Sequence, residues 1–217
     1  MSNLVGSETL DLSGNGTITS ANVGNNKSVS LNTLSINNDT GVASNYTLNG
    51  GTHQLSVSQR SISMSGSRSY NGSTTVNSSD LNVFNNLVSD ETLDITGSGT
   101  VSSANVGSSK SVTIGSLSLS NGTGSSANYT LGSATLDITQ KSLTISGSKV
   151  YDGTNVIQGS NLSTFSGIVS GETLSMTGSG TVASANIGND KTVTNTSLQL
   201  LDGSGSASNY SIANTIS

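Results

Sequence analysis

The chain lacks most of the residue types on which catalysis depends. Its 217 residues include no cysteine, no proline, no tryptophan and one histidine, His53, and only 9% of them are charged. Without cysteine there is no disulfide and no thiolate ligand, and a lone histidine completes neither a metal site nor a nucleophile with its base. We therefore expect no enzymatic activity and no bound cofactor.

Basic residues and long apolar runs are also scarce. Seven Lys and Arg are scattered through a chain of net charge −5, so no basic face is available to neutralise phosphates, and nucleic acid is not an expected partner. No apolar run approaches the roughly 20 residues that cross a bilayer as a helix. We expect no membrane insertion in this segment.

Four small or polar residue types dominate instead: 47 Ser, 27 Thr, 25 Asn and 26 Gly. A chain this polar resembles a disordered tract, which buries too little apolar surface to offset the entropy of ordering. However, Val, Ile and Leu alternate with Ser and Thr, as at Leu93 and Ile95 or at Leu136 and Ile138. This alternation predicts β-strands with one wet face.

The sequence repeats itself. The stretch SANVG occurs at residues 20–24 and 103–107, and SANIG occurs at 184–188. Three further sets recur with the same two offsets, 91 − 8 = 83 and 172 − 91 = 81: Glu8, Glu91 and Glu172; Lys27, Lys110 and Lys191; Tyr46, Tyr129 and Tyr210. A period near 81 exceeds one solenoid unit, so we expect a repeat of whole domains. The predicted repeats are residues 1–60, 61–141 and 142–217.

Each repeat is predicted to be all-β, with six or seven strands packed as a small β-sandwich, immunoglobulin-like or related, in an elongated array. At Gly115-Ser116 the apolar phase slips by one residue, which requires a bulge or a strand break. The segments 55–65 and 136–146 pass from one predicted strand to the next with few polar residues between. We therefore expect stiff junctions between repeats.

The third repeat opens with KVYDGT at 149–154 and closes with ASNYSI at 207–212. With the intervening FSGIVSGETLSMTGSGTVASANIGNDKTVT, it resembles the YDG-type repeat of bacterial surface adhesins, found in filamentous-haemagglutinin-like proteins of two-partner secretion. The resemblance implies an extracellular, cell-surface location and a role as a stalk or adhesive module. The first repeat lacks the YDG head and the third lacks the last strand, as expected of a segment of a longer array.

Two candidate sites follow from the recurring residues. An amide crosslink could join Lys110 to Asn105 or Asn128, with Glu91 moving the protons, as in some surface adhesins; the alternative is a lysine that faces solvent at a strand edge. Calcium could bind the oxygen-rich pairs Asp90-Glu91 or Asp152 with Asn155, although the same residues are typical of turns.

The Asn-Tyr-Thr/Ser triplets at Asn45, Asn128 and Asn209 are glycosylation sequons. We predict instead that their tyrosines lie in the core with a hydrogen-bonded phenol oxygen.

Such a module has three classes of expected partner. The repeats either space a binding tip from the cell or bind a host or neighbouring-cell ligand, such as a carbohydrate, through rows of Thr, Ser and Asn. A third alternative is self-association through strand edges, as in a biofilm, since proline, which blocks edge pairing, is absent.

Overall fold

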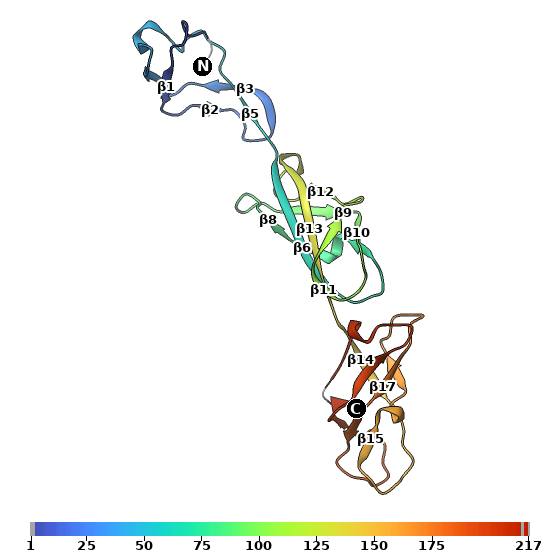
Figure 1. Cartoon of the computed structure of the whole chain (residues 1–217). Coiled ribbons are helices and arrows are strands. Elements are labelled where there is room, and N and C mark those ends of the chain that lie inside the picture. The colour runs from blue at the N-terminus through green and yellow to red at the C-terminus, as the bar shows by residue number, and fades with distance from the viewer. Residues whose placement is uncertain (1–2, 214, 217) are drawn as a thin grey trace. The chain divides into compact units, whose positions relative to one another are not determined.

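The computed structural model of the chain describes residues 3–213, 215 and 216. In this part of the chain all regular structure is β-strand apart from short 3-10 turns (Figure 1), so the all-β prediction is confirmed. The chain divides into two compact units. One takes the chain up to Ser61 with Asp90–Leu93 and Asn121–Thr130; the other takes Ile62–Ser89, Asp94–Ser120 and the residues from Leu131 onward.

The strands recur with the sequence. The first recurrence contains β1 (Leu10–Ser13), β2 (Thr17–Ile18), β3 (Gly24–Ser30), β4 (Ser35–Asn38), η1 (Ala43–Asn45) and β5 (Gln54–Val57). The second contains β6 (Arg60–Ser69), β7 (Thr75–Asn77), η2 (Ser78–Asp80), β8 (Leu81–Asn85), β9 (Leu93–Thr96), β10 (Ser98–Val101), β11 (Gly107–Thr113), β12 (Ser118–Asn121), η3 (Ser126–Asn128) and β13 (Tyr129–Thr139). The third contains β14 (Lys141–Ser146), β15 (Val156–Gln158), η4 (Gly159–Asn161), β16 (Thr164–Ser166), β17 (Leu174–Thr177), β18 (Ser179–Thr181), β19 (Val193–Asn195), β20 (Gln199–Asp202), η5 (Ala207–Asn209), β21 (Tyr210–Ile212) and β22 (Thr215–Ile216).

The sheets recur as well. The orders β2-β3-β5, β10-β11-β13 and β18-β19-β22 occupy equivalent positions, and each recurrence adds a separate two-stranded pair, β1-β4, β9-β12 or β17-β20. In the second recurrence the larger sheet has the full order β7-β10-β11-β13-β6-β8. Most neighbours are antiparallel, but β14 and β21 pair in parallel, Lys141 opposite Tyr210.

The predicted break in the apolar phase is confirmed. Strand β11 ends at Thr113 and β12 begins at Ser118, and the turn between them is closed by a hydrogen bond from Leu117 N–H to the Ile114 carbonyl oxygen. The break lets apolar side chains on both strands turn inward although their spacing has changed. The strands on either side belong to different sheets.

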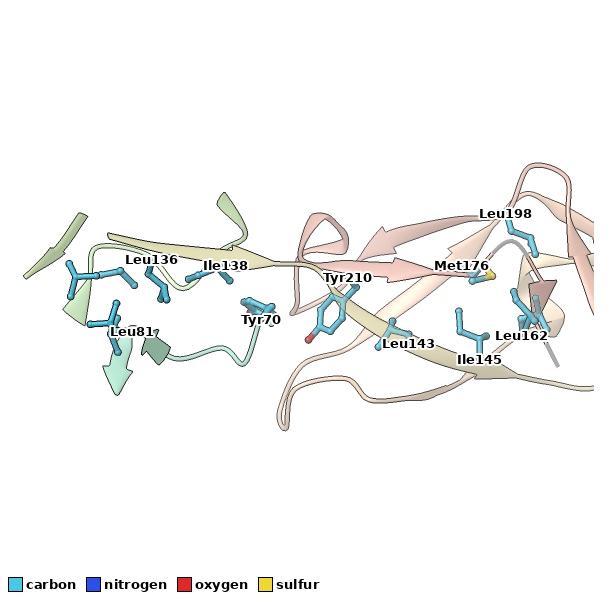
Figure 2. Close-up of a cluster of buried hydrophobic side chains, with 14 of the residues drawn as sticks. Tyr70, Leu81, Leu136, Ile138, Leu143, Ile145, Leu162, Met176, Leu198 and Tyr210 are labelled. Carbon is cyan, nitrogen blue, oxygen red and sulfur yellow. The ribbon is translucent and has the colours of Figure 1, made fainter. Parts of the chain in front are cut away.

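The apolar core of the second unit consists of the inward residues of these alternating strands. Leu136 and Ile138 are at most 2% exposed while Asp137 between them faces solvent, as a half-buried strand requires. Figure 2 shows the core side chains from Leu81 and Leu136 through Tyr70 and Tyr210 to Met176 and Leu198. One continuous cluster of buried side chains therefore connects the second and third recurrences.

The connections between recurrences are very short. Only Gln140 separates β13 from β14, and two residues separate β5 from β6. The predicted passage from strand to strand is confirmed at both positions. None of the helical turns among residues 3–213, 215 and 216 has the length and hydrophobicity that a membrane-crossing helix needs.

Candidate functional site: the junction between repeats

The three SAN(V/I)G stretches form the same turn. In each, the serine Oγ accepts a hydrogen bond from the backbone N–H of the asparagine two residues later. The N to Oγ distance is 3.2 Å for each of the three serines, Ser20, Ser103 and Ser184. This contact is the local turn that serine hydroxyls favour. It holds the asparagine and the next backbone N–H at one end of each repeat.

The glycine and the lysine of the motif belong together. A Cβ on Gly107 would lie 3.0 Å from Lys110 Cε, and the equivalent distance at Gly24 and Lys27 is 2.9 Å. The lysine stem thus packs where any larger residue would project. Lys27 Nζ donates to the Ser20 carbonyl oxygen at 3.1 Å, which closes the loop that the serine began. The motif is a folded loop with a lysine clamp, and this accounts for the fixed spacing between its glycine and lysine.

The asparagine that precedes the recurring tyrosine binds this loop from the next repeat. Val106 N–H donates to Asn209 Oδ1 at 2.9 Å, and Asn209 Nδ2 donates to Asn105 Oδ1 at 3.0 Å. Asn209 is 1% exposed, and no other polar side chain among the described residues is buried to this extent. Because its oxygen and its nitrogen are both bonded, its burial costs little.

The junction between the first and second repeats repeats these contacts. Val23 N–H donates to Asn128 Oδ1 at 2.9 Å, and Asn128 Nδ2 donates to Asn22 Oδ1 at 3.0 Å. A glutamine in each connection adds a further contact, since Gln59 Nε2 donates to the Ala127 carbonyl oxygen and Gln140 Nε2 donates to that of Ser208, both at 3.1 Å. Two junctions with the same hydrogen bonds indicate one mode of docking.

Two tyrosines and a glutamate complete the junction between the second and third repeats. The hydroxyls of Tyr70 and Tyr210 each donate to the Glu172 carboxylate at 2.5 Å, one to each oxygen. The two rings lie edge to face with centroids 5.4 Å apart (Figure 2), a favourable aromatic geometry. Burial, followed by the hydrogen bond to the Glu172 carboxylate, raises the pKa of Tyr70 to about 12. The pKa of Tyr210 is raised by the same two causes.

The predicted core tyrosines are largely confirmed. Tyr129 and Tyr210 are buried, Tyr46 is half-buried, and the hydroxyl of each donates to the recurring glutamate: Glu91, Glu172 and Glu8 respectively. Tyr70 was not predicted to take part. Its position in the YDG-type head did not reveal that it would reach the next repeat.

The residues of the predicted crosslink have separate hydrogen-bond partners. Glu91 accepts from Tyr129, Asn128 bonds to Val23 and Asn22, and Asn105 accepts from Asn209. Lys110 is half-buried, and its stem packs over Gly107. The amide bond stays a prediction, and intact mass tests it through the loss of about 17 Da per bond to asparagine.

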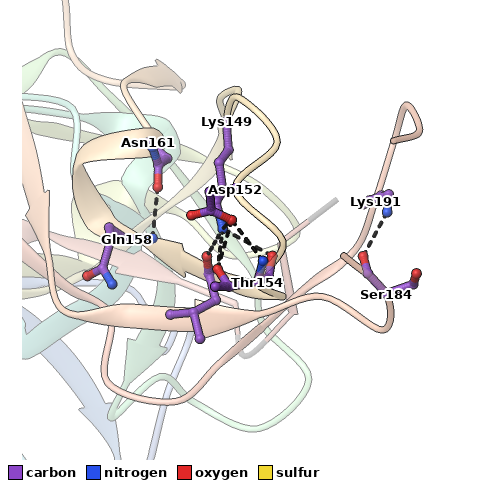
Figure 3. A network of polar contacts seen from close by, with 8 residues as sticks. Lys149, Asp152, Thr154, Gln158, Asn161, Ser184 and Lys191 are labelled. Carbon is purple, nitrogen blue, oxygen red and sulfur yellow. Dashed lines mark hydrogen bonds and ion pairs between the residues drawn. The ribbon is translucent and has the colours of Figure 1, made fainter. Parts of the chain in front are cut away.

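The predicted calcium ligands lie in turns. Asp152 Oδ1 accepts from Lys149 Nζ at 2.7 Å and from Thr154 N–H at 2.9 Å (Figure 3), and these contacts, the lysine first, lower the pKa of Asp152 to about 2. Asp90 has a positive φ of 66°. In the described part of the chain no group of three or more His, Cys, Asp or Glu residues is placed to hold a metal ion.

Comparison with known families agrees with the recurrence. The model of the YDG domain matches residues 53–136 and again residues 138–217. The chain belongs to the YDG domain family. No curated protein and no solved structure matches it.

The triplet that gives the YDG family its name forms a tight turn in both copies. In the second repeat Asn71 Oδ1 accepts from Ser73 N–H at 3.0 Å, the same contact that Asp152 makes in the third. Gly72 and Gly153 have φ of 74° and 78°, a conformation that glycine adopts without strain. Asn therefore replaces Asp at the middle position without changing the turn.

Proposed function

We propose that the chain is a structural and interaction segment of a bacterial cell-surface adhesin, in which docked YDG repeats act as a stiff spacer or adhesive module. The observation that carries the proposal is the junction between the second and third repeats. It combines a connection of one residue with a buried asparagine that is hydrogen-bonded across the junction. Domains joined by flexible linkers lack such contacts.

We infer further that each repeat of about 81 residues is a small β-sandwich. Support comes from the recurrence of one three-stranded core sheet order and one separate two-stranded pair in each repeat. Buried residues alternate with exposed ones along these strands, as in sheets that pack on one face.

We also propose that the protein is extracellular and is exported by two-partner secretion, as its resemblance to filamentous-haemagglutinin-like proteins implies. A chain without cysteine and rich in Ser, Thr and Gly is compatible with passage through a membrane pore in the unfolded state. Its ligand would be a host or neighbouring-cell surface, reached by the repeats themselves or by a tip that they support.

Carbohydrate binding along the repeats is the second candidate. It requires exposed hydroxyl groups that are available to a sugar. Several of these hydroxyls bond to one another across strands, including Thr96 Oγ1 with Ser118 Oγ at 3.2 Å and Ser13 Oγ with Ser35 Oγ at 3.1 Å. This pairing favours the spacer over the binder.

Small-angle scattering tests the spacer. The full chain is compared with a variant that carries ten Gly and Ser residues inserted after Gln140. If the junction is stiff, the insertion broadens the pair-distance distribution, because a flexible linker samples many separations. Identical distributions for the two proteins would contradict the proposal. Binding of the full chain to a glycan array tests the second candidate.

A further inference from the structure

Arg68 clamps the loop that carries the YDG-type triplet of the second repeat, residues 70–75. It lies near the end of β6, and its guanidinium donates to the carbonyl oxygens of Ser73 and Thr75. The Arg68 side chain is 7% exposed and forms an ion pair with Asp80, 3.1 Å from Nη1 to Oδ2. A cation this deeply buried requires a carboxylate partner, because burial of an unpaired charge is costly.

Lys149 clamps the equivalent loop of the third repeat, residues 151–156. Its Nζ donates to the carbonyl oxygens of Thr154 and Val156, at 3.1 and 2.7 Å (Figure 3). These three residues have the same offset from their counterparts in the second repeat, 149 − 68 = 81. The carboxylate paired with Lys149 is that of Asp152, 2.7 Å from Nζ to Oδ1, and it belongs to the triplet itself.

The two repeats place the carboxylate of this ion pair at different positions. Position 71 is asparagine where the third repeat has Asp152, and position 80 is aspartate where the third repeat has Asn161. Asn71 and Asp152 both accept a hydrogen bond from the N–H two residues later. Asp80 and Asn161 both accept one from the N–H three residues earlier (Figure 3). Because the backbone contacts are the same for amide and carboxylate, the exchange concerns charge: each repeat keeps one carboxylate for its cation.

The clamped loop of the second repeat carries two residues that contact the third repeat. Tyr70 OH donates to Glu172 at 2.5 Å, and a Cβ on Gly72 would lie 2.8 Å from Val169 Cγ1. Tyr70 N–H also donates to the Thr139 carbonyl oxygen at 2.8 Å, and this bond fixes the start of the loop. The clamp fixes its end. The positions of the tyrosine and the glycine therefore follow from how this loop is folded.

We propose that Arg68 and its carboxylate are positioning residues of the junction, and that this carboxylate can be supplied from position 80 or from position 71. The ion pair keeps the guanidinium on the two loop carbonyls, and the loop then holds the Tyr70 hydroxyl within reach of Glu172. Without the carboxylate the buried guanidinium is unpaired, so it moves toward water and releases the loop. The inference rests on the proposed function, because it names residues that keep the junction docked.

The pH dependence of urea unfolding tests the proposal, because it reports on the Tyr70 hydroxyl. The pKa of Tyr70 is raised to about 12, so its titration increases the equilibrium constant for unfolding about 100-fold as the pH rises from below 10 to above 12. Asp80→Asn removes the charge and keeps the backbone contact that Asn161 makes in the third repeat. We expect Asp80→Asn to show the smaller increase that Tyr70→Phe shows.

A double variant tests whether the position of the carboxylate is interchangeable. Asn71→Asp combined with Asp80→Asn gives the second repeat the charge arrangement of the third, with the carboxylate three residues after the cation. We expect this variant to regain the full increase between pH 10 and pH 12. Asp94→Asn removes the same charge from an exposed site on β9 and is the matched control. Its pH profile should equal that of the unaltered chain.

Two results would overturn the proposal. If Asp80→Asn lowers stability by the same factor at every pH from about 7 to about 12, the ion pair stabilises the fold without positioning Tyr70. If the double variant behaves like Asp80→Asn, position 71 does not supply the carboxylate. Should Asp80→Asn fail to fold by circular dichroism, the double variant decides alone: recovery of the fold and of the pH profile supports the proposal, and no recovery overturns it. Either failure leaves the spacer standing if scattering of the unaltered chain shows a stiff junction.

Discussion

Replacing Asn209 by alanine tests whether the repeats are held together by the contacts described here. The substitution removes the hydrogen bond from Val106 N–H at 2.9 Å and the one to Asn105 Oδ1 at 3.0 Å. Each contributes about 1 kcal/mol net, and leaving the Val106 N–H without a partner inside the junction costs about 1 to 3 kcal/mol more. We expect Asn209→Ala to lower the free energy of unfolding of the second unit by about 3 to 5 kcal/mol.

The chain supplies its own matched control. Asn45 occupies the same position in the first repeat, between a serine and a tyrosine, but it is exposed. Asn45→Ala is expected to change the free energy of unfolding by no more than about 0.5 kcal/mol, as surface substitutions usually do. The two variants remove the same atoms from the same local sequence, so their difference isolates the effect of docking.

Urea unfolding at 25 °C, followed by tyrosine fluorescence and by circular dichroism, measures both variants. Tyrosine is a suitable probe because the chain has no tryptophan and because Tyr70 and Tyr210 lie in the junction. The reasoning is refuted if Asn209→Ala and Asn45→Ala unfold at the same urea concentration with equal slopes. A loss of cooperativity for Asn209→Ala alone would mean that the second and third repeats have become independent.

Three further predictions follow from single residues. The pKa of Tyr70 is raised to about 12, so its stabilising effect is complete below pH 10 and is lost between about pH 10 and pH 12, a change of about 3 kcal/mol. A pH titration of urea unfolding measures this loss, and Tyr70→Phe should reduce it and leave the part due to the raised pKa of Tyr210. Ser109 has a φ of 50°, and the equivalent residues in the other repeats are Asn26 and Asp190, types that adopt a positive φ more easily than serine. Ser109→Asn should therefore raise the free energy of unfolding by about 0.5 to 1 kcal/mol and raise the melting temperature, and an unchanged melting temperature would count against backbone strain at this position. A Cβ on Gly66 would lie 1.8 Å from the Asp80 carbonyl oxygen, so Gly66→Ala should lower the free energy of unfolding in urea by more than about 3 kcal/mol. A decrease below about 1 kcal/mol would show that β6 and β8 move apart easily at this position.

The sequence was sufficient to predict strands because their evidence is local. Alternation placed Leu136 and Ile138 on a buried face, and the phase slip at Gly115 located a strand break. Both conclusions rest on the period of two of an extended chain, which holds whatever the strand packs against. The order of strands in each sheet depends on contacts between distant residues, and no local pattern encodes it.

The junction was visible in the sequence as repetition, but its chemistry was not. Recurrence with the same offsets favours Asn105 and Asn128 as candidate partners of Lys110. Each of these asparagines bonds to an asparagine of a neighbouring repeat, Asn209 or Asn22, and the amide bond to Lys110 stays a prediction. Two residues that recur together can contact each other within one repeat or across consecutive repeats, and equal offsets are compatible with both. Only the folded arrangement of the repeats distinguishes the two.

Tyr70 and Tyr151 show how strongly the burial of a repeated residue depends on what surrounds its repeat. Both belong to YDG-type triplets, and both precede a glycine with positive φ, yet one is 5% exposed and the other 62%. Their local sequences do not explain a difference of this size, because the turn is the same. What differs is what covers the tyrosine: Tyr70 N–H donates to the Thr139 carbonyl oxygen of a neighbouring strand and its hydroxyl donates to Glu172 of the next repeat. The burial of a repeated residue in this chain is therefore set by the neighbouring strand and the neighbouring repeat, and the local turn fixes only its backbone conformation.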